Sequence, residues 1–363
     1  MVGPADFRTS PGIRDSAERV AADPAASLYC FDAERGEAVF VECATPEEVL
    51  RAPFLYEAQA RLAQWLIRMP FAEFHRLADC FAPPEGRLIW IHSVGRCGST
   101  LVSKALDTLP HVRSLSEPDD LTQIVLLRSE KALPDTELAA LIESSVRWRC
   151  RPAQDAATRF AIKTRSEVTS IAGFLTQLYP RAKHVFLYRD GTSWANSVFK
   201  SRWLDADLTA PIDPGDLRKG WARMIPLVAE RIAAGAPLNP VEVRTLGWIS
   251  AMESYFVMRD AAVDLCAARF EDLTADPIGT LNALFRFCDL DGADWGLIRE
   301  VLGRDSQAGT VFDREERARV ARSLSSEELA PVERLVAERP RLRTPSVVLP
   351  GTLAPSGSSG STV

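Results

Sequence analysis

The sequence predicts an α/β fold: a three-layer sandwich in which helices cover both faces of a central, mainly parallel sheet. Two continuous apolar runs, RFAIKT at 159–164 and AKHVFLYR at 182–189, are typical of parallel strands buried on both faces. From Gly86 onward, strand-like and helix-like patterns alternate. The stretch RLIWIHSVGRCGSTLVSKALDTL at 87–109 has the order strand, glycine-containing turn, helix. These three observations carry the prediction.

The composition fits one large domain or two ordinary ones. The chain has 363 residues, of which 46% are hydrophobic and 25% charged, so we expect a packed core. The net charge of −6 argues against nucleic-acid binding through charge alone, and any anion site must be a local basic pocket.

The sequence also indicates a cytoplasmic location. The N-terminus has no apolar signal core, and no run approaches the ~20 apolar residues of a membrane span. The seven cysteines are scattered and include no C-x-x-C pair, which argues against a disulfide framework or a zinc site and fits a reducing compartment.

Residues 1–85 are expected to form an N-terminal segment that packs on the core. Its first 27 residues, rich in Pro, Asp and Ala, are predicted to be loose, and SLYCFD and AVFVECA read as two strands around the turn AERGE. The stretch 52–69 is predicted to be one amphipathic helix with Pro53 near its start. Its apolar face would comprise Leu55, Leu62, Trp65, Leu66 and Met69.

Residues 86–345 form the predicted main domain. VRSLS at 112–116 reads as a short strand, and helices are expected at 167–179 and 192–203, with residues 216–262 mostly helical. Residues 346–363, which end in LAPSGSSGSTV, are predicted to be a flexible tail.

The first candidate site is the loop at 93–100, which precedes a helix. Gly95 and Gly98 allow tight or positive-φ backbone, and Ser99 and Thr100 can cap the helix or bond phosphate oxygens. Backbone N–H groups at a helix N-terminus suit an anion. The Walker pattern G-x-x-x-x-G-K-[ST] is absent, so an ordinary capped turn remains the alternative. Cys97 is expected to be only a small residue within this loop.

The second candidate site is LYRDGTSWANS, where an apolar strand ends at Arg189 and Ser197 follows eight residues later. An Arg at the carboxyl end of a strand points into the crevice where α/β proteins bind ligands. Its planar fork suits phosphate, and a Ser adds a hydroxyl. The alternative is a local salt bridge at Arg189 with a solvated Ser197.

Two further candidates follow strands. Glu117, in SLSEPDD, is placed to act as a general base beside an anion site, although it can also be read as helix N-terminal charge. Lys163, at the end of RFAIK, can stabilise charge on a leaving group, or it can be a surface lysine with a buried stem. All four candidates lie where strands end, which predicts one crevice with three cations, one carboxylate and a backbone anion nest.

In these motifs the chain resembles the sulfotransferases that use 3′-phosphoadenosine 5′-phosphosulfate (PAPS). SVGRCGSTLVSKAL looks like their 5′-phosphosulfate loop, LYRDGTSWANS looks like their 3′-phosphate motif, and ARFEDLTADPIGTLNALFRFCDL is similar to a stretch that follows later in family chains. The resemblance covers roughly residues 86–290, and it implies PAPS as co-substrate with no metal.

The resemblance also implies roles for single residues. Arg96 would bind the 5′-phosphate and bridging region together with the N–H groups of Gly98, Ser99 and Thr100. The 3′-phosphate would be bound by Arg189 and Ser197. Glu117 looks like the acidic base of the carbohydrate and tyrosyl members, and Lys163 is similar to a lysine that those members place near the transferred group. The binding residues implied are therefore Gly95, Arg96, Cys97, Gly98, Ser99, Thr100, Arg189 and Ser197.

The sequence departs from the family pattern at two points. Arg96 stands where many members have Lys, and the C-terminal R-K-G-x-x-G-D-W-K motif is missing, because RKGW at 218–221 precedes RFEDL. A P-loop kinase or another nucleotide phosphotransferase, and a non-catalytic nucleotide-binding protein, stay open as alternatives.

The acceptor is left open as a small molecule, sugar, lipid or peptide with a hydroxyl or amine, and the oligomeric state is not predicted. Several aromatic residues could line an apolar acceptor pocket, although they can equally be core: Trp203, Trp221, Trp248, Tyr255 and Phe256.

Overall fold

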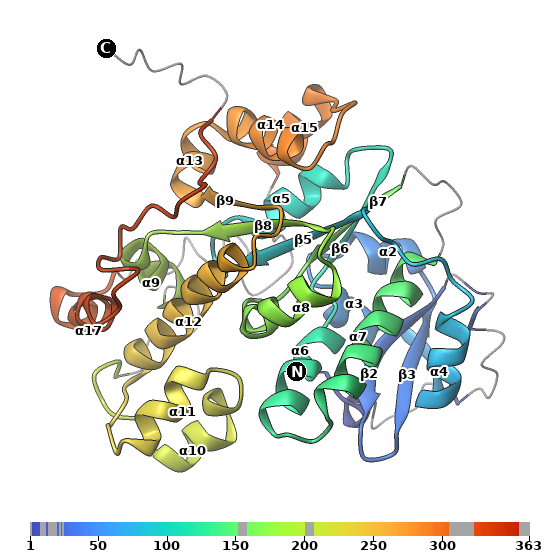
Figure 1. Ribbon diagram of the computed structural model, residues 1–363, viewed down its shortest axis with the longest axis horizontal. Helices are drawn as coiled ribbons and strands as arrows, with labels where there is room; N and C mark the ends of the chain where they lie inside the picture. The colour runs from blue at the N-terminus through green and yellow to red at the C-terminus, as the bar shows by residue number, and fades with distance from the viewer. Residues whose placement is uncertain are drawn as a thin grey trace.

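The computed structural model has a parallel sheet, a second, smaller sheet and helices around both (Figure 1). It describes residues 2–7, 12–13, 20–21, 23, 25–151, 158–199, 207–304 and 323–355. Trp203, residues 200–203 of the helix predicted at 192–203, and residues 356–363 of the predicted tail lie outside these ranges.

The larger sheet has five strands, all parallel, in the order β6-β7-β5-β8-β9. This confirms the predicted fold class. All six residues of β5 and five of the six of β8 are buried, as strands covered on both faces require. The strands are β5 (Leu88–Ser93), β6 (Val112–Ser116), β7 (Arg159–Lys163), β8 (Lys183–Tyr188) and β9 (Leu265–Arg269).

Helices lie on both faces of this sheet. In Figure 1, α5 (Ser99–Leu106), α14 (Pro277–Phe287) and α15 (Trp295–Gly303) lie above it. The other face is covered by helices that include the long α12 (Pro240–Asp260). The remaining helices of the main domain are α6 (Asp120–Ser129), α7 (Asp135–Cys150), η2 (Ser166–Ile171), α8 (Ala172–Leu178), α9 (Gly191–Phe199), α10 (Pro214–Lys219), η3 (Trp221–Arg223), α11 (Pro226–Ala233), α13 (Phe270–Ala275) and α17 (Ser326–Ala337).

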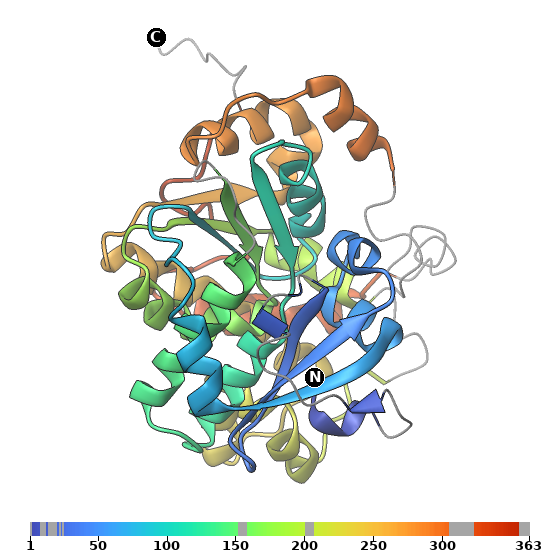
Figure 2. The ribbon, with the colours of Figure 1, turned by 90° about the vertical axis from the view of Figure 1, so that its right-hand side faces the viewer.

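The N-terminal region forms a four-stranded sheet in the order β1-β4-β3-β2. It lies below the edge of the parallel sheet and appears in blue in Figure 2. The predicted strands at 27–32 and 38–44 are present as β2 (Ala26–Asp32) and β3 (Glu37–Cys43). The rest of the region comprises η1 (Pro4–Asp6), β1 (Gly12–Ile13), α2 (Pro46–Arg51), α3 (Leu55–Leu62), β4 (Ala63–Pro70) and α4 (Phe71–Ala78).

The prediction of one helix over 52–69 is wrong. The helix α3 ends at Leu62, and β4 pairs antiparallel with β3 from residue 63 onward. An extended chain sends alternate side chains to opposite faces, so Leu66 joins one hydrophobic cluster while Ile67 and Met69 join another. Residues 63–70 contribute side chains to hydrophobic clusters on both faces of the sheet. A strand allows this, because a helix would bury apolar side chains along only one of its faces.

Two segments predicted to be loose are held by contacts. Near the N-terminus, the amide of Val2 donates to Asp119 Oδ2 at 2.8 Å, and β1 pairs with β4. Near the C-terminus, Leu349 is 1% exposed and Thr352 bridges to Ala267 of β9. The prediction of a flexible tail is therefore wrong for residues 346–355, because their apolar side chains and backbone groups find partners on the main domain.

The predicted helical stretch at 216–262 is present as α10, η3, α11 and α12. Trp248, Tyr255 and Phe256 on α12 are buried in the core, whereas Trp221 is partly buried beneath the guanidinium of Arg244. Among the described residues, no helix is both long and apolar enough to cross a membrane.

Candidate functional site

The four sequence-predicted sites come together at one edge of the parallel sheet. Glu117 follows β6, Lys163 ends β7, the loop 94–98 follows β5 and Arg189 follows β8. Because these strands are parallel and adjacent in the order β6-β7-β5-β8, their carboxyl ends form one continuous edge. The candidate residues therefore lie in a row across neighbouring strands.

The loop between β5 and α5 has the backbone of an anion nest. Gly95, Arg96 and Gly98 have φ values of 73°, 55° and 80°. Left-handed residues next to right-handed ones turn successive backbone N–H groups to one side. The first N–H groups of α5, which starts at Ser99, have no partner within the helix. Together these donors suit a phosphate or sulfate group.

Gly98 cannot be replaced by a larger residue without strain. Its φ of 80° is one that residues with a Cβ rarely adopt, and a Cβ there would come within 2.8 Å of the Leu273 side chain. Leu273 belongs to α13, which follows β9. The stretch 268–290, noticed in the sequence for its resemblance, thus packs directly against the loop.

Buried hydrogen bonds fix the loop to β8 and α9. The indole of Trp194 donates to the carbonyl of Val94 at 3.1 Å, and the thiol of Cys97 contacts the carbonyl of Leu187 at 3.3 Å. Burial raises the pKa of Cys97 to about 11, so its thiol stays protonated at neutral pH. The contribution of Cys97 is therefore packing and backbone geometry.

Arg189 connects the loop to α9 and α13. Its Nη1 donates to the carbonyl of Arg96 at 3.2 Å, and its Nε donates to Ser193 Oγ at 2.9 Å. The guanidinium lies 4.3 Å from the centre of the Phe270 ring. Burial lowers the pKa of Arg189, which remains a cation. Within the described ranges it forms no ion pair, and no hydrogen bond joins it to Ser197, which is half-buried further along α9.

Glu117 and Lys163 form an ion pair at the other end of the row. Lys163 Nζ donates to Glu117 Oε1 at 2.5 Å and to Ser116 Oγ at 3.4 Å. The Lys163 side chain is 1% exposed and lies 5.8 Å from the Phe54 ring, whereas that of Glu117 is 15% exposed. The backbone N–H of Glu117 donates to the carbonyl of Lys163 at 2.7 Å. The carboxylate is thus held beside the sheet edge by two contacts to one residue.

Two of the candidate residues have strained backbone. Arg96 and Glu117 have φ values of 55° and 58°, and each follows a strand of the parallel sheet. Lys131, Ala262 and Asp289 also have positive φ, but each lies just beyond the end of a helix, where the left-handed conformation is common. Positive φ in a non-glycine residue costs energy and clusters at functional sites.

Several residues of this site were missed in the sequence. Ser193 accepts from Arg189 and donates to Glu271 Oε1 at 3.1 Å, so it links α9 to α13. Asp119 accepts from Arg165 at 2.8 Å and forms a second carboxylate–cation pair beside Glu117. The four-residue spacing from Arg189 to Ser193 was a usable signal, whereas the long-range partners were not visible in local sequence.

No protein-family model and no curated protein matches the chain. Among solved structures, it is similar to the sulfotransferase STF9 from Mycobacterium avium, with 14% identity over 88% of each chain and a TM-score of 0.42. The sulfotransferase STF1 from Mycobacterium tuberculosis shares 14% identity over 69% of this chain and 82% of that one, with a TM-score of 0.38. A mouse sulfotransferase, SULT7A1, complexed with PAP, shares 13% identity over 73% of this chain and 88% of its own, with a TM-score of 0.35. Because these sequence identities and TM-scores are low, we infer the function from the geometry of the site.

Proposed function

We propose that the protein is a sulfotransferase that moves a sulfuryl group from PAPS to a hydroxyl or amine acceptor. The observation that carries this proposal is the row formed by Glu117, Lys163, the loop and Arg189 along one sheet edge. One end of the row holds a carboxylate that can accept a proton, and the other holds Arg189, a cation without a direct ion pair in the described ranges.

The nucleotide would lie along the loop and Arg189. The N–H groups of Gly98, Ser99 and Thr100, together with Arg96, would hold the 5′-phosphosulfate. Arg189 would bind the 3′-phosphate with Ser197, and its contact with the carbonyl of Arg96 supports a common site for both phosphates. No step of this scheme is assigned to a metal.

The transfer itself would run in line. The acceptor oxygen or nitrogen attacks sulfur, the bond from sulfur to the 5′-phosphate oxygen breaks, and that oxygen keeps the electron pair. Glu117 takes the acceptor's proton. Lys163 and Arg96 offset the charge that develops on the leaving phosphate. Positioning and electrostatics would supply most of the acceleration, as they do in phosphoryl transfer.

A ligand-stability experiment tests the nucleotide. We expect adenosine 3′,5′-bisphosphate to raise the unfolding temperature far more than either adenosine 5′-monophosphate or ATP with Mg²⁺, because a ligand that binds only the native state stabilises it. A larger shift with ATP and Mg²⁺ would favour the phosphotransferase instead. Mass spectrometry of PAPS incubated with pooled small-molecule, sugar, lipid and peptide acceptors then tests turnover and identifies the acceptor class.

A further inference from the structure

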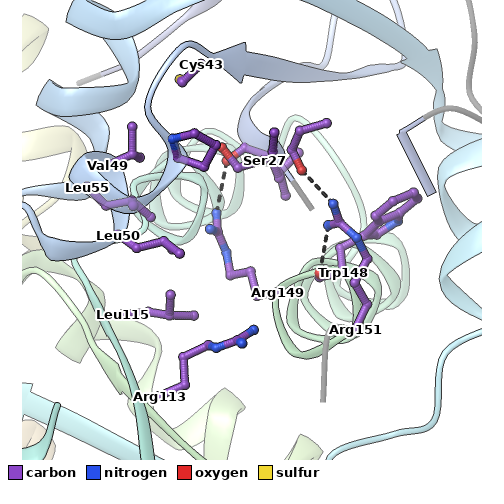
Figure 3. A pocket seen from close by; sticks show the side chains of 14 residues that line it. Ser27, Cys43, Val49, Leu50, Leu55, Arg113, Leu115, Trp148, Arg149 and Arg151 are labelled. Carbon is purple, nitrogen blue, oxygen red and sulfur yellow. Dashed lines mark hydrogen bonds between the residues drawn. The ribbon is translucent and has the colours of Figure 1, made fainter. Parts of the chain in front are cut away.

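A second cationic pocket lies away from the row, between the N-terminal region and the parallel sheet. Its cavity volume is about 130 Å³. This is below the usual range for drug-sized ligands, so the pocket suits only a small one. Arginines from β6 and from the end of α7 enter it, and aliphatic side chains from α2, α3 and β6 form much of its wall (Figure 3). Those labelled in Figure 3 are Arg113, Arg149, Arg151, Val49, Leu50, Leu55 and Leu115.

Two of the three arginines are held by the protein. Arg149 forms an ion pair with the buried Asp120. Arg151 donates to the backbone carbonyls of Asp23 at 2.8 Å and Ala26 at 2.6 Å, and it lies over the Trp148 ring. Carbonyl oxygens satisfy its hydrogen bonds but supply no full negative charge. Burial lowers the pKa of Arg151 to about 10, and repulsion from Arg149 and Arg113 acts in the same direction.

The side chain of the third arginine, Arg113, forms no hydrogen bond or ion pair with the part of the chain that the structure describes, although its backbone belongs to the β6–β7 ladder. It extends from β6 toward the other two arginines (Figure 3). Its guanidinium has five N–H donors that make no bond to the described chain, so an anion in this pocket can accept from them.

The remaining wall is apolar and reaches the surface. Leu50 is 44% exposed, one of few large apolar side chains in the described chain with that exposure, and it lines the pocket with Val49, Leu55 and Leu115. The exposed Leu50 and the buried aliphatic wall behind it favour a ligand with a hydrocarbon portion. Charge and apolar surface thus occupy one cavity.

We propose that this pocket binds a small amphipathic carboxylate, whose anionic head contacts Arg113 and whose short aliphatic chain packs on the leucine wall. The pocket lies on the face of β6 opposite to α5, whereas the nucleotide row lies at the carboxyl ends of the strands. Ser114 and Ser116 alternate with Arg113 and Leu115 along the strand, and Ser114 bonds Ser103 of α5. The inference therefore holds whether or not the chain transfers sulfuryl groups.

Calorimetric titration of the full chain with three matched probes tests the proposal. Octanoate should bind, and octan-1-ol and octylammonium should bind at least tenfold more weakly, because only octanoate carries the anionic head. Equal affinity for octanoate and octan-1-ol, or no saturable binding of octanoate, would overturn the proposal.

A variant series assigns the site. Arg113→Gln should weaken octanoate binding at least tenfold and leave octan-1-ol unaffected, whereas Arg113→Lys should lose only a few-fold because it keeps the charge. Arg128→Gln is the matched control, since Arg128 is a surface residue paired with Asp135 at 2.9 Å, and it should bind octanoate as the parent does. Parent-like affinity in Arg113→Gln would exclude this pocket. If that variant does not fold, the three-probe comparison and Arg113→Lys still decide.

Discussion

The protein has two clusters of cationic side chains, one along the sheet edge and one in the arginine pocket, and the two clusters differ in structure. Along the sheet edge, each side chain comes from the end of a different strand, and backbone N–H groups in strained conformations lie among them. In the arginine pocket of Figure 3, the charges come from side chains on β6 and α7, and the rest of the wall is largely aliphatic.

This difference indicates what each place can bind. Backbone N–H groups and separated cations spread donors over a length, which suits a ligand with several charged groups such as a nucleotide. Three arginines beside leucines suit one charge with an apolar chain. The difference also indicates what a substitution would change. Along the sheet edge, it should change the reaction rate or the ligand affinity. In the pocket, it should lower stability where the substituted arginine has a buried partner.

The largest effect is expected at Glu117. Glu117→Gln still accepts a hydrogen bond from Lys163 but cannot take the acceptor's proton, so single-turnover transfer at saturating PAPS should slow by about 10²–10⁴-fold. Nucleotide affinity should hold or rise, because a negative charge beside the phosphosulfate is removed. Urea unfolding of the variant measures any loss of stability separately.

The opposite result at Glu117 would also be informative. A rate within about threefold of the parent, a barrier change under ~1 kcal/mol, would remove the base assignment. The role of Glu117 would then be to form an ion pair with the buried ammonium of Lys163. It would stabilise the fold, as Asp120 does through its ion pair with Arg149.

In the pocket, Arg149→Ala should mainly cost stability. Its side chain is 6% exposed and its partner Asp120 is fully buried, so the variant leaves a buried carboxylate without its cation. Loss of one partner of a buried ion pair costs about 3–5 kcal/mol, measurable by urea unfolding. Arg147→Ala is the matched control on the same helix, because its pair with the exposed Asp79 should contribute under about 1 kcal/mol. Equal losses in the two variants would contradict the structural role of Arg149.

Much of the sheet edge could be predicted from the sequence. Strands buried on both faces have continuous apolar runs, and in a parallel sheet the residues that follow such runs must meet at one edge. The placement of Lys163 and Arg189 follows from that rule, whereas Glu117 follows a strand, VRSLS, that has no continuous apolar run. The pairing of Glu117 with Lys163 does not follow from the rule either, since their contact depends on β6 and β7 being neighbours, which is a matter of topology.

The arginine pocket and the N-terminal sheet could not be predicted in this way. The helical spacing of apolar residues at 52–69 is real, but pairing with β3 and burial on both faces of β4 outweigh it. Arg113 looks like an ordinary charged residue of a short strand, and its lack of a partner becomes visible only when β6, α7 and the N-terminal segment are packed together. Long-range packing decided both cases.

Arg189→Ala tests whether Arg189 binds the 3′-phosphate of the nucleotide. We expect the affinity for adenosine 3′,5′-bisphosphate to fall by about 2–3 kcal/mol, the contribution of a charge-assisted hydrogen-bonding partner. Affinity for adenosine 5′-monophosphate should barely change in the same titration. Because Arg189 also bonds the carbonyl of Arg96, an equal loss for both nucleotides would mean that it holds the loop and does not read the phosphate.

The smallest expected effect is a loss of stability at low pH in the two strands that precede the loop and Arg189. His92 on β5 and His184 on β8 are buried and stacked, with His92 Nε2 and His184 Nδ1 3.1 Å apart, and these strands carry the loop and Arg189. Burial lowers the pKa of both, to about 4 for His184, where nearby Asp264 opposes the shift. In the unfolded chain, histidines bind protons below a pKa of about 6.5. In the native state, the two buried histidines bind protons only at lower pH. Stability should therefore fall as pH drops from about 6.5 toward 4, by about 2 kcal/mol at pH 5 for His184 alone.

Urea unfolding at pH 7.5 and pH 5 measures this loss. His184→Gln should reduce the dependence on pH, and His111→Gln, which changes a histidine outside the stacked pair, is the control. Hydrogen exchange at pH 5 should increase first in β5 and β8, since no histidine lines the arginine pocket within the described chain. A pH dependence that survives in His184→Gln, or exchange that rises first around α7, would mean that acid does not act through the histidines of β5 and β8.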